Sequence, residues 1–260
     1  MKRLLGILLC AFLVLSLVAC GGKEQDKVTF TVGFDAEFPP YGFQNDQGEY
    51  DGFDLELARE VCSRRGWEFV AQPIDWNAKD MELESGSIDC IWNGFTMSDE
   101  RLDKYTWSKP YMDNSQVFVV AADSGIKTQA DLAGKVVVTQ EASSALEALE
   151  GEDCTELTAS FKELLEVPDY NTAFLNLEAG GADAVAMDIG VAKFQVESRG
   201  GKFVILDEPI TEEKYAIGFK LGNTDLKDKV EETLTEMYKD GTFTKISDRW
   251  GLTDSVIFGE

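Results

Sequence analysis

The chain has 260 residues, a formal net charge of −24 at pH 7 from 48 acidic and 24 basic residues, and no histidine. So acidic a surface repels nucleic acid and the anionic faces of membranes, which excludes both as expected partners of this surface. Without histidine, the chain lacks the most common general base and the most common metal ligand, which argues against catalysis or metal binding built on that residue.

The N-terminal segment predicts an exported protein. Lys2 and Arg3 precede a nearly unbroken apolar run over residues 4–18. This run is too short for a comfortable membrane span and is typical of the core of a signal peptide. Removing a signal peptide over residues 1–19 takes away these two positive charges, so the formal charge changes from −24 to −26.

The apolar run ends in Leu-Val-Ala-Cys at residues 17–20. This sequence resembles the bacterial lipobox, in which the cysteine becomes the lipid-modified first residue. An ordinary signal peptide with Cys20 as a bystander is the alternative. We expect a lipid anchor on Cys20 and a flexible tether over residues 20–27, which would place the protein outside the cytoplasm and attach it to the cell membrane.

Roughly 230 residues follow, enough for one large domain or two small lobes. Besides Cys20, three cysteines remain after processing, and none of them forms a C-x-x-C pair, so the sequence supports neither a metal site nor a redox site. Cys62 in a predicted helix and Cys90 in a predicted strand are expected to be small buried apolar residues. No cofactor is expected.

Apolar periodicity predicts an α/β fold in which strands alternate with helices. Strands are predicted over residues 28–34, 67–71, 88–92, 116–122, 135–139, 183–187, 203–206 and 215–220. Helices are predicted over residues 52–65, 78–84, 144–149, 172–178, 192–197, 226–239 and 243–250. This alternation indicates parallel sheets with helices packed on their faces.

A weak internal repeat favours two similar units. Residues 83–89 (LESGSID) and residues 177–183 (LEAGGAD) each combine a helix end, a glycine stop and an aspartate that opens a strand. Ligands of open α/β sheets bind at the carboxyl ends of the strands, so we expect two sets of strand ends to face each other across a binding site.

Four segments resemble, in order, those of the extracellular solute-binding proteins of polar amino acid ABC importers, family 3. They are residues 35–43 (DAEFPPYGF), 52–58 (GFDLELA), 94–101 (GFTMSDER) and 105–111 (YTWSKPY). The resemblance runs from about residue 28 to residue 252. It implies a type II periplasmic binding protein-like fold, with two Rossmann-like lobes joined by two crossing strands and a ligand cleft between them.

By this resemblance, lobe 1 comprises residues 28–115 plus 217–260, and lobe 2 comprises residues 116–216. The crossings then fall near Ser115-Gln116 and Ala216-Ile217. Some relatives form a disulfide from the position of Cys62 to a second cysteine shortly after it. This chain has no cysteine over residues 63–89, so that disulfide cannot form here.

The resemblance assigns three residues to the carboxylate of an amino acid ligand. The planar guanidinium of Arg101 matches a carboxylate with two parallel hydrogen bonds. Thr96 would add its hydroxyl and its backbone N–H, and Ser143 would add an amide at a helix start, where anions are favoured. The alternatives are a solvated arginine in a polar run and a serine that only caps its helix.

The resemblance assigns the ammonium group of the ligand to Asp188, at the end of a lobe 2 strand, and to the backbone carbonyl groups of Asn93 and Gly94. An N-cap of the following helix is the alternative for Asp188. By the resemblance, glycine at position 94 lets the ligand approach the chain closely. Phe38 and Trp76 would wall the aliphatic part of the ligand, although both could instead be half-buried lids on a core.

Asp35 ends the first strand, and by the resemblance it faces the ligand side chain. A carboxylate there prefers a donor, which favours lysine, ornithine, arginine, histidine or glutamine and disfavours aspartate and glutamate. The alternative is local, because aspartate often bonds the backbone of a following turn. Between cationic and amide side chains the residues leave the choice open.

The resemblance therefore implies a monomeric substrate-binding lipoprotein that captures a polar or cationic L-amino acid and delivers it to an ABC permease, without chemistry of its own. Two other functions stay open. One is an enzyme similar to cyclohexadienyl dehydratase on the same scaffold, and the other is a soluble ligand sensor. The sequence offers no histidine or metal-ligand cluster to support catalysis.

Overall fold

The computed structural model describes residues 27–259. The predicted signal peptide, Cys20 and all of the predicted tether except Lys27 lie outside the described residues. Between residues 27 and 259, no helix combines the length and the apolar character needed to cross a membrane.

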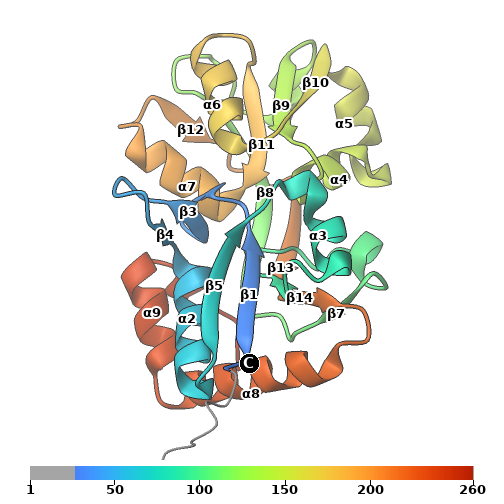
Figure 1. The fold of residues 1–260 in the computed structure, drawn as a ribbon. Coiled ribbons are helices and arrows are strands. Elements are labelled where there is room, and N and C mark those ends of the chain that lie inside the picture. Colours follow the sequence, from blue (N-terminus) through green and yellow to red (C-terminus); the bar gives the residue numbers. More distant parts are fainter. Residues whose placement is uncertain (1–26, 260) are drawn as a thin grey trace, which may run out of the picture.

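The first lobe is built on a five-stranded sheet in the order β5-β1-β6-β14-β7. Its strands are β1 (Thr29–Phe34), β5 (Glu68–Pro73), β6 (Cys90–Ile91), β7 (Tyr105–Trp107) and β14 (Gly218–Lys220). Its helices are α2 (Phe53–Arg65), α3 (Lys79–Ser85), α8 (Thr224–Lys239) and α9 (Thr242–Trp250). Strand β1 pairs in parallel with β5 on one side and with β6 on the other. Helices α2, α8 and α9 pack together beside these strands (Figure 1).

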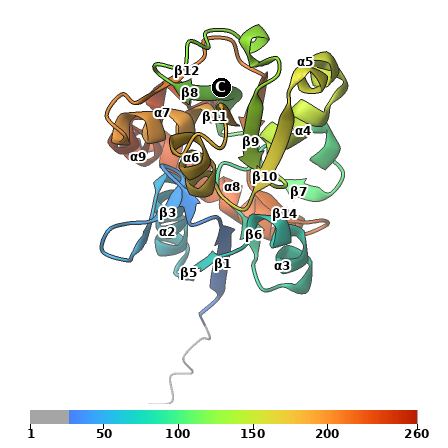
Figure 2. The same ribbon diagram turned by 90° about the horizontal axis from the view of Figure 1, so that it is seen from above.

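The second lobe is built on a sheet in the order β10-β9-β11-β8-β12, to which β13 adds by pairing with β8. Its strands are β8 (Met112–Ala121), β9 (Val136–Gln140), β10 (Glu163–Val167), β11 (Ala184–Asp188), β12 (Phe203–Ile205) and β13 (Thr211–Tyr215). Its helices are α4 (Ser144–Glu150), α5 (Thr155–Ser160), α6 (Tyr170–Glu178) and α7 (Ile189–Ser198). Seen from above, α4 and α5 cover one face of this sheet and α6 and α7 the other (Figure 2).

Short elements complete the chain. A three-stranded sheet of lobe 1 consists of β2 (Glu37–Phe38), β3 (Gly42–Gln44) and β4 (Tyr50–Asp51). The single-turn helices are η1 (Trp76–Ala78), η2 (Asp99–Arg101), η3 (Gln129–Leu132), η4 (Glu152–Cys154) and η5 (Thr253–Ser255). Each of η1 and η2 follows a lobe 1 strand after a loop, and each carries a residue predicted to bind the ligand, Trp76 in η1 and Arg101 in η2.

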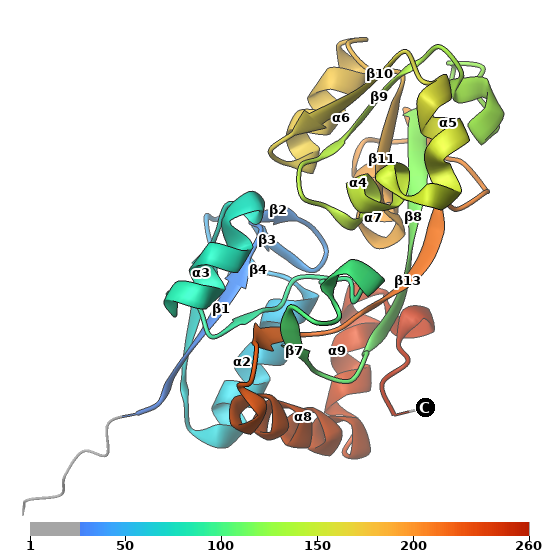
Figure 3. The same ribbon diagram turned by 90° about the vertical axis from the view of Figure 1, so that its right-hand side faces the viewer.

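Two extended segments connect the lobes. Strands β8 and β13 pair antiparallel from Met112 opposite Tyr215 to Gln116 opposite Thr211, and they run side by side from one lobe to the other (Figure 3). The prediction of one strand over residues 215–220 is wrong. Tyr215 is the last residue of β13 in one lobe, and residues 218–220 form β14 in the other. The exact division of the chain between the lobes stays a prediction.

Among the strands and α-helices, the predicted elements missed helix α5, strands β7 and β10, all of β13 except Tyr215, and the small sheet β2-β3-β4. Strand β10 is a sheet edge that pairs only with β9, and its residues are exposed or half-buried, so it lacks the buried apolar run expected of an inner strand. Helix α5 has no fully buried residue, which leaves little amphipathic signal. The buried helix α2 was predicted closely, and Gly66 ends it in the left-handed conformation that glycine adopts readily.

The cysteines behave as expected for apolar residues. Cys62 in α2, Cys90 in β6 and Cys154 are all buried, and each is a free thiol. Burial raises the pKa of all three thiols, which keeps them in the neutral form.

Candidate ligand-binding site

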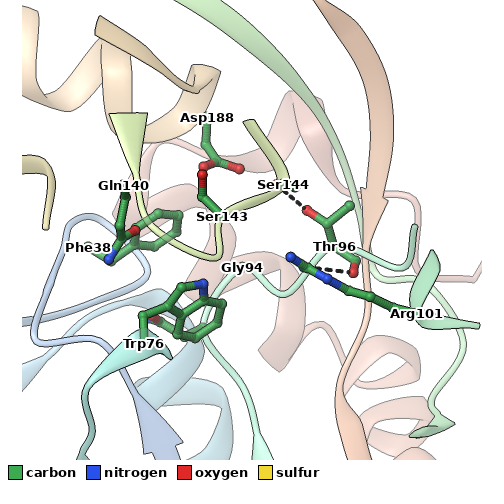
Figure 4. A pocket seen from close by; sticks show the side chains of 10 residues that line it. Phe38, Trp76, Gly94, Thr96, Arg101, Gln140, Ser143, Ser144 and Asp188 are labelled. Atoms are coloured by element: carbon green, nitrogen blue, oxygen red, sulfur yellow. Dashed lines mark hydrogen bonds between the residues drawn. The ribbon is translucent and has the colours of Figure 1, made fainter. Parts of the chain in front are cut away.

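A small cavity of about 10 Å³ lies between the two lobes (Figure 4). It is lined by Phe38, Trp76, Asn93, Gly94, Thr96, Arg101, Gln140, Ser143, Ser144 and Asp188. Every residue that the sequence assigned to the ligand lines this cavity except Asp35. This volume holds about one water molecule, so an amino acid could enter only after the lobes or the lining side chains move.

The carboxyl ends of strands from both sheets meet at this cavity, as the α/β pattern predicted. Gly94 and Thr96 follow β6 of lobe 1, whereas Gln140 and Asp188 are the last residues of β9 and β11 of lobe 2. The carboxyl ends of these strands lie at the edge of each sheet, so side chains at or just after the ends can face the cleft.

Two aromatic rings wall the lobe 1 side of the cavity. Phe38 packs against Tyr41 and Tyr170, with ring centroids 5.7 and 6.0 Å apart. Trp76 meets Phe95 edge-on at 5.6 Å. Both rings are buried and line the cavity, so they belong to the core, and their contact with a ligand stays a prediction.

The loop after β6 is fixed by polar contacts to its backbone and side chains. The N–H of Gly94 donates to Asp54 Oδ2 at 2.6 Å, and Asn93 Oδ1 accepts from the N–H of Asp35 at 3.0 Å. Gly94 has φ +54°, and a Cβ there would lie 2.9 Å from the Phe38 ring and 3.0 Å from the Tyr215 ring. Glycine is therefore required by the backbone and by the packing of these two rings.

Arg101 is buried at the edge of the cavity, with 3% of its surface exposed. Its Nε donates to Glu147 Oε1 at 2.8 Å, and its Nη2 lies 2.6 Å from the same oxygen. Its Nη1 reaches the Thr96 carbonyl oxygen at 3.4 Å, and the guanidinium carbon lies 5.1 Å from the centre of the Phe95 ring. The alternative of a solvated arginine is therefore wrong.

Two serines lie where α4 begins. The Ser143 hydroxyl caps this helix by accepting from the N–H of Leu146 at 3.1 Å, as the alternative for this residue predicted. Its own N–H is directed at the Gln140 carbonyl oxygen at 3.4 Å, so a ligand carboxylate would have to compete for that amide. Ser144, which was not predicted, places its hydroxyl 3.1 Å from Thr96 Oγ1.

Asp188 is buried at the end of β11, with 3% of its surface exposed. Asp188 is the N-cap residue of α7, as the alternative predicted, but its carboxylate makes no capping hydrogen bond to the helix. It accepts hydrogen bonds from Asn114 Nδ2 at 2.8 Å, Gln116 Nε2 at 2.7 Å and the Tyr215 hydroxyl at 2.6 Å. Burial, and after it the nearby carboxylate of Glu213, raises the pKa of Asp188 to about 7.

This part of the site holds a surplus of hydrogen-bond acceptors. Glu213 Oε1 accepts from the same Asn114 and Gln116 amide groups, at 2.6 and 2.8 Å. The amide oxygens of Asn114 and Gln116 are buried and have no donor among the described residues. Acceptors in excess, two of them carboxylates, suit a group that only donates, such as an ammonium.

Asp35 lies behind the cavity wall and connects the lobes. Its Oδ1 accepts from the N–H of Glu37 at 2.8 Å, which is the local turn contact considered for it. Its Oδ2 accepts from Gln140 Nε2 of lobe 2 at 2.6 Å. Burial is the main cause that raises the pKa of Asp35 to about 6. The two hydrogen bonds lower this pKa, and the carboxylates of Asp169 and Glu37 make smaller contributions that raise it.

Sequence reasoning missed Gln140, Ser144, Glu147 and Glu213. Gln140 ends a predicted strand, as Asp35 and Asp188 do, so the argument used for those aspartates could have found it. The roles of Glu147 and Glu213 depend on which surfaces of the two lobes come into contact, and the spacing of residues along the sequence does not show this.

Comparison with known proteins yields a consistent set of relatives. A sequence model of the bacterial extracellular solute-binding proteins, family 3, matches residues 30–253. The L-cystine-binding protein TcyJ of Escherichia coli K12 is 30% identical over 230 residues, covering 88% of this chain and 84% of TcyJ. The arginine-binding extracellular protein ArtP of Bacillus subtilis is 28% identical over 257 residues, covering 96% of this chain and 98% of ArtP.

A solved structure shows the same arrangement of lobes. An ABC uptake transporter substrate-binding protein from Streptococcus pneumoniae, with bound histidine, superimposes with a TM-score of 0.81 at 35% identity, covering 89% of this chain and 93% of that one. The predicted two-lobed, type II periplasmic binding protein-like fold is thereby confirmed.

Proposed function

The chain belongs to the bacterial extracellular solute-binding proteins of family 3, and on that premise we propose that it captures a polar or cationic L-amino acid outside the cell and delivers it to the permease of an ABC importer. One observation carries this function. A buried guanidinium from lobe 1, Arg101, and a buried carboxylate from lobe 2, Asp188, line one small cavity between the lobes (Figure 4). These groups complement the carboxylate and the ammonium of a free amino acid, both of which need a partner once water is excluded.

Each predicted site residue takes a place in this proposal. Arg101, Thr96 and Ser143 bind the ligand carboxylate. Asp188 binds the ammonium, together with the carbonyl groups of Asn93 and Gly94. The rings of Phe38 and Trp76 enclose the aliphatic stem.

The side chain of the ligand is set by the pair Asp35 and Gln140. The carboxylate of Asp35 is surrounded by further negative charge from Glu37 and Asp169, and Gln140 lines the cavity beside it. An acidic side chain would add like charge to a dry site. The proposal is therefore a cationic or amide side chain, a class to which the ligands named for ArtP and for the pneumococcal protein also belong.

The chain performs no chemistry in this proposal, in keeping with the relatives compared above, whose names describe binding proteins. Native mass spectrometry of the protein, purified without added ligand, tests both parts. We expect a bound amino acid that is recovered chemically unchanged after incubation. A bound molecule that is not an amino acid, or conversion of the bound amino acid, would reject the function.

The chain is further proposed to work as a monomer on a lipid anchor at Cys20. The support is the lipobox-like sequence at residues 17–20. The variant Cys20→Ala should lose lipid attachment and be released from the membrane fraction. Unchanged processing and unchanged membrane retention would reject the anchor.

A further inference from the structure

Glu147 forms a bridge between the lobes at the edge of the cavity. It belongs to α4 of lobe 2, and its Oε1 accepts from Arg101 of lobe 1 through Nε at 2.8 Å and Nη2 at 2.6 Å. Its other oxygen accepts from the Ser98 hydroxyl, also in lobe 1, at 2.9 Å. Both carboxylate oxygens are therefore used, and both partners lie across the cleft.

The backbone just before α4 is held from the same side. The carbonyl oxygen of Ala142 accepts from Arg101 Nη2 at 3.3 Å and from Lys79 Nζ at 3.3 Å. These contacts and those of Glu147 all join lobe 1 donors to one lobe 2 segment, residues 142–147. Because the donors and acceptors belong to different lobes, the contacts exist only while the lobes are close.

The pairing also fixes the plane of the guanidinium. The Arg101 side chain is 4% exposed and that of Glu147 25% exposed, so the pair is largely shielded from water and its geometry is well defined. Glu147 occupies the Nε edge of the planar fork, whereas Nη1 has only a long contact of 3.4 Å with the Thr96 carbonyl oxygen. The Nη1 side is thus left for another carboxylate.

We propose that Glu147 is a positioning residue that docks on Arg101 when the lobes close, holds the guanidinium plane toward the ligand carboxylate and latches the closed form. The effect of Glu147 on ligand binding rests on the proposed function. The latching of the closed form by Glu147 does not, because it concerns the ligand-free protein as well. A ligand held under this latch leaves only after the Arg101–Glu147 pair opens, so the pair acts on the dissociation rate.

The binding test compares Glu147→Gln with Glu150→Gln by stopped-flow kinetics, using the amino acid that the wild-type protein binds. Glu150 is an exposed residue of the same helix, so its replacement removes the same charge without touching Arg101. We expect Glu147→Gln to raise the dissociation rate at least about tenfold while the association rate changes less than about twofold, because loss of a shielded charge pair acts on dissociation. Rates equal to those of Glu150→Gln would overturn the proposal, and so would tighter binding, which would make Glu147 a competitor of the ligand.

A second measurement needs no ligand and separates this proposal from the proposed function. Met81 in α3 and Leu175 in α6 are 67% and 63% exposed, and these helices lie on opposite lobes, away from the side where β8 and β13 connect them (Figure 3). Spin labels on Met81→Cys and Leu175→Cys report the opening between the lobes. In the ligand-free protein, Glu147→Gln should shift the distances to larger values, and Glu150→Gln should not. Identical distributions in both variants would overturn the latch even if no amino acid bound.

Discussion

Arg101 and Asp188 differ in the charges that already surround them. Arg101 is paired with Glu147. The neighbours of Asp188 are neutral donors and a second carboxylate, that of Glu213. In the described part of the chain, neither Asp188 nor Glu213 takes part in an ion pair. The ammonium of the ligand therefore supplies the positive charge that this end of the cavity lacks.

Replacing Arg101 tests the carboxylate end. Arg101→Ala should cost at least ~3 kcal/mol of binding free energy, because the ligand carboxylate and Glu147 would both be left without their partner. Arg101→Lys should also bind poorly, since one ammonium cannot form the planar fork. Calorimetry measures the loss, and thermal unfolding of each variant shows whether the fold is intact. A wild-type dissociation constant in a folded Arg101→Ala protein would refute the assignment.

The pH dependence tests the ammonium end. Asp188, whose pKa is raised to about 7, must be ionised to bind an ammonium, and its neighbours Glu213, Tyr41, Tyr170 and Tyr215 bring no positive charge. Binding should therefore weaken roughly 10-fold or more between about pH 7.5 and about pH 5.5. Calorimetry at both values measures the change, and equal affinity would contradict the role of Asp188.

The free protein should show the opposite trend. A pKa that is raised in the folded state favours the protonated form, so its stabilising effect is complete at low pH and is lost as the pH rises through about 7. Asp35, with a pKa of about 6, and Asp54, with a pKa of about 7, act in the same direction. The melting temperature without ligand should thus fall from about pH 5 to about pH 8, and Asp188→Asn should reduce the fall.

Among the elements, the loop between β6 and η2 depends on helix α2, which does not line the cavity. Asp54, at the start of α2, accepts from the Gly94 N–H at 2.6 Å and from the Tyr111 hydroxyl at 2.8 Å. Asp54 is fully buried, and burial raises its pKa to about 7. The helix thereby determines where Gly94 and its neighbours stand against the cavity.

Asp54→Ala should lower the free energy of unfolding by about 2–4 kcal/mol, because a buried N–H and a buried hydroxyl would lose their acceptor. Urea denaturation measures the difference. Asp46→Ala, at an exposed position of the same lobe, serves as the control and should change it by less than about 0.5 kcal/mol. Equal stability of the two variants would contradict the supporting role of Asp54.

Elements with a long buried apolar pattern were the easiest to predict from the sequence, although β5 was predicted without a buried residue and β7 was missed despite the buried Tyr105. Helix α2 and strands β1, β8, β9 and β11 carry such patterns, whereas the edge strand β10 does not. The cavity residues followed from strand ends and from resemblance. The partners Glu147 and Glu213 did not, because their contacts arise only when two lobes or a connecting strand are brought together.

The whole molecule is held in one arrangement by polar contacts between the lobes. Besides Arg101–Glu147, Gln140 donates to Asp35 at 2.6 Å, and Asn171 of lobe 2 donates to Glu37 of lobe 1. All of these contacts join residues of one lobe to residues of the other. Hinge-type closure around a ligand would form these interlobe contacts together, and opening would break them together.

Small-angle scattering tests that motion. With saturating ligand the radius of gyration should decrease, because residues of both lobes must reach one small molecule at the same time. Proteins with the substitution Arg101→Ala should show no decrease at the same ligand concentration. Identical scattering curves with and without ligand would count against closure.

The most direct test of capture between the lobes is a calorimetric panel of the twenty common amino acids and ornithine, run on the wild-type protein and on Asp35→Asn. We predict tight binding of at least one of lysine, ornithine, arginine, histidine and glutamine, and poor binding of aspartate and glutamate, with an altered order of preference in Asp35→Asn. Tight binding of glutamate, or an unchanged order of preference in Asp35→Asn, would contradict the role of Asp35. Absence of binding by every amino acid would contradict the function itself.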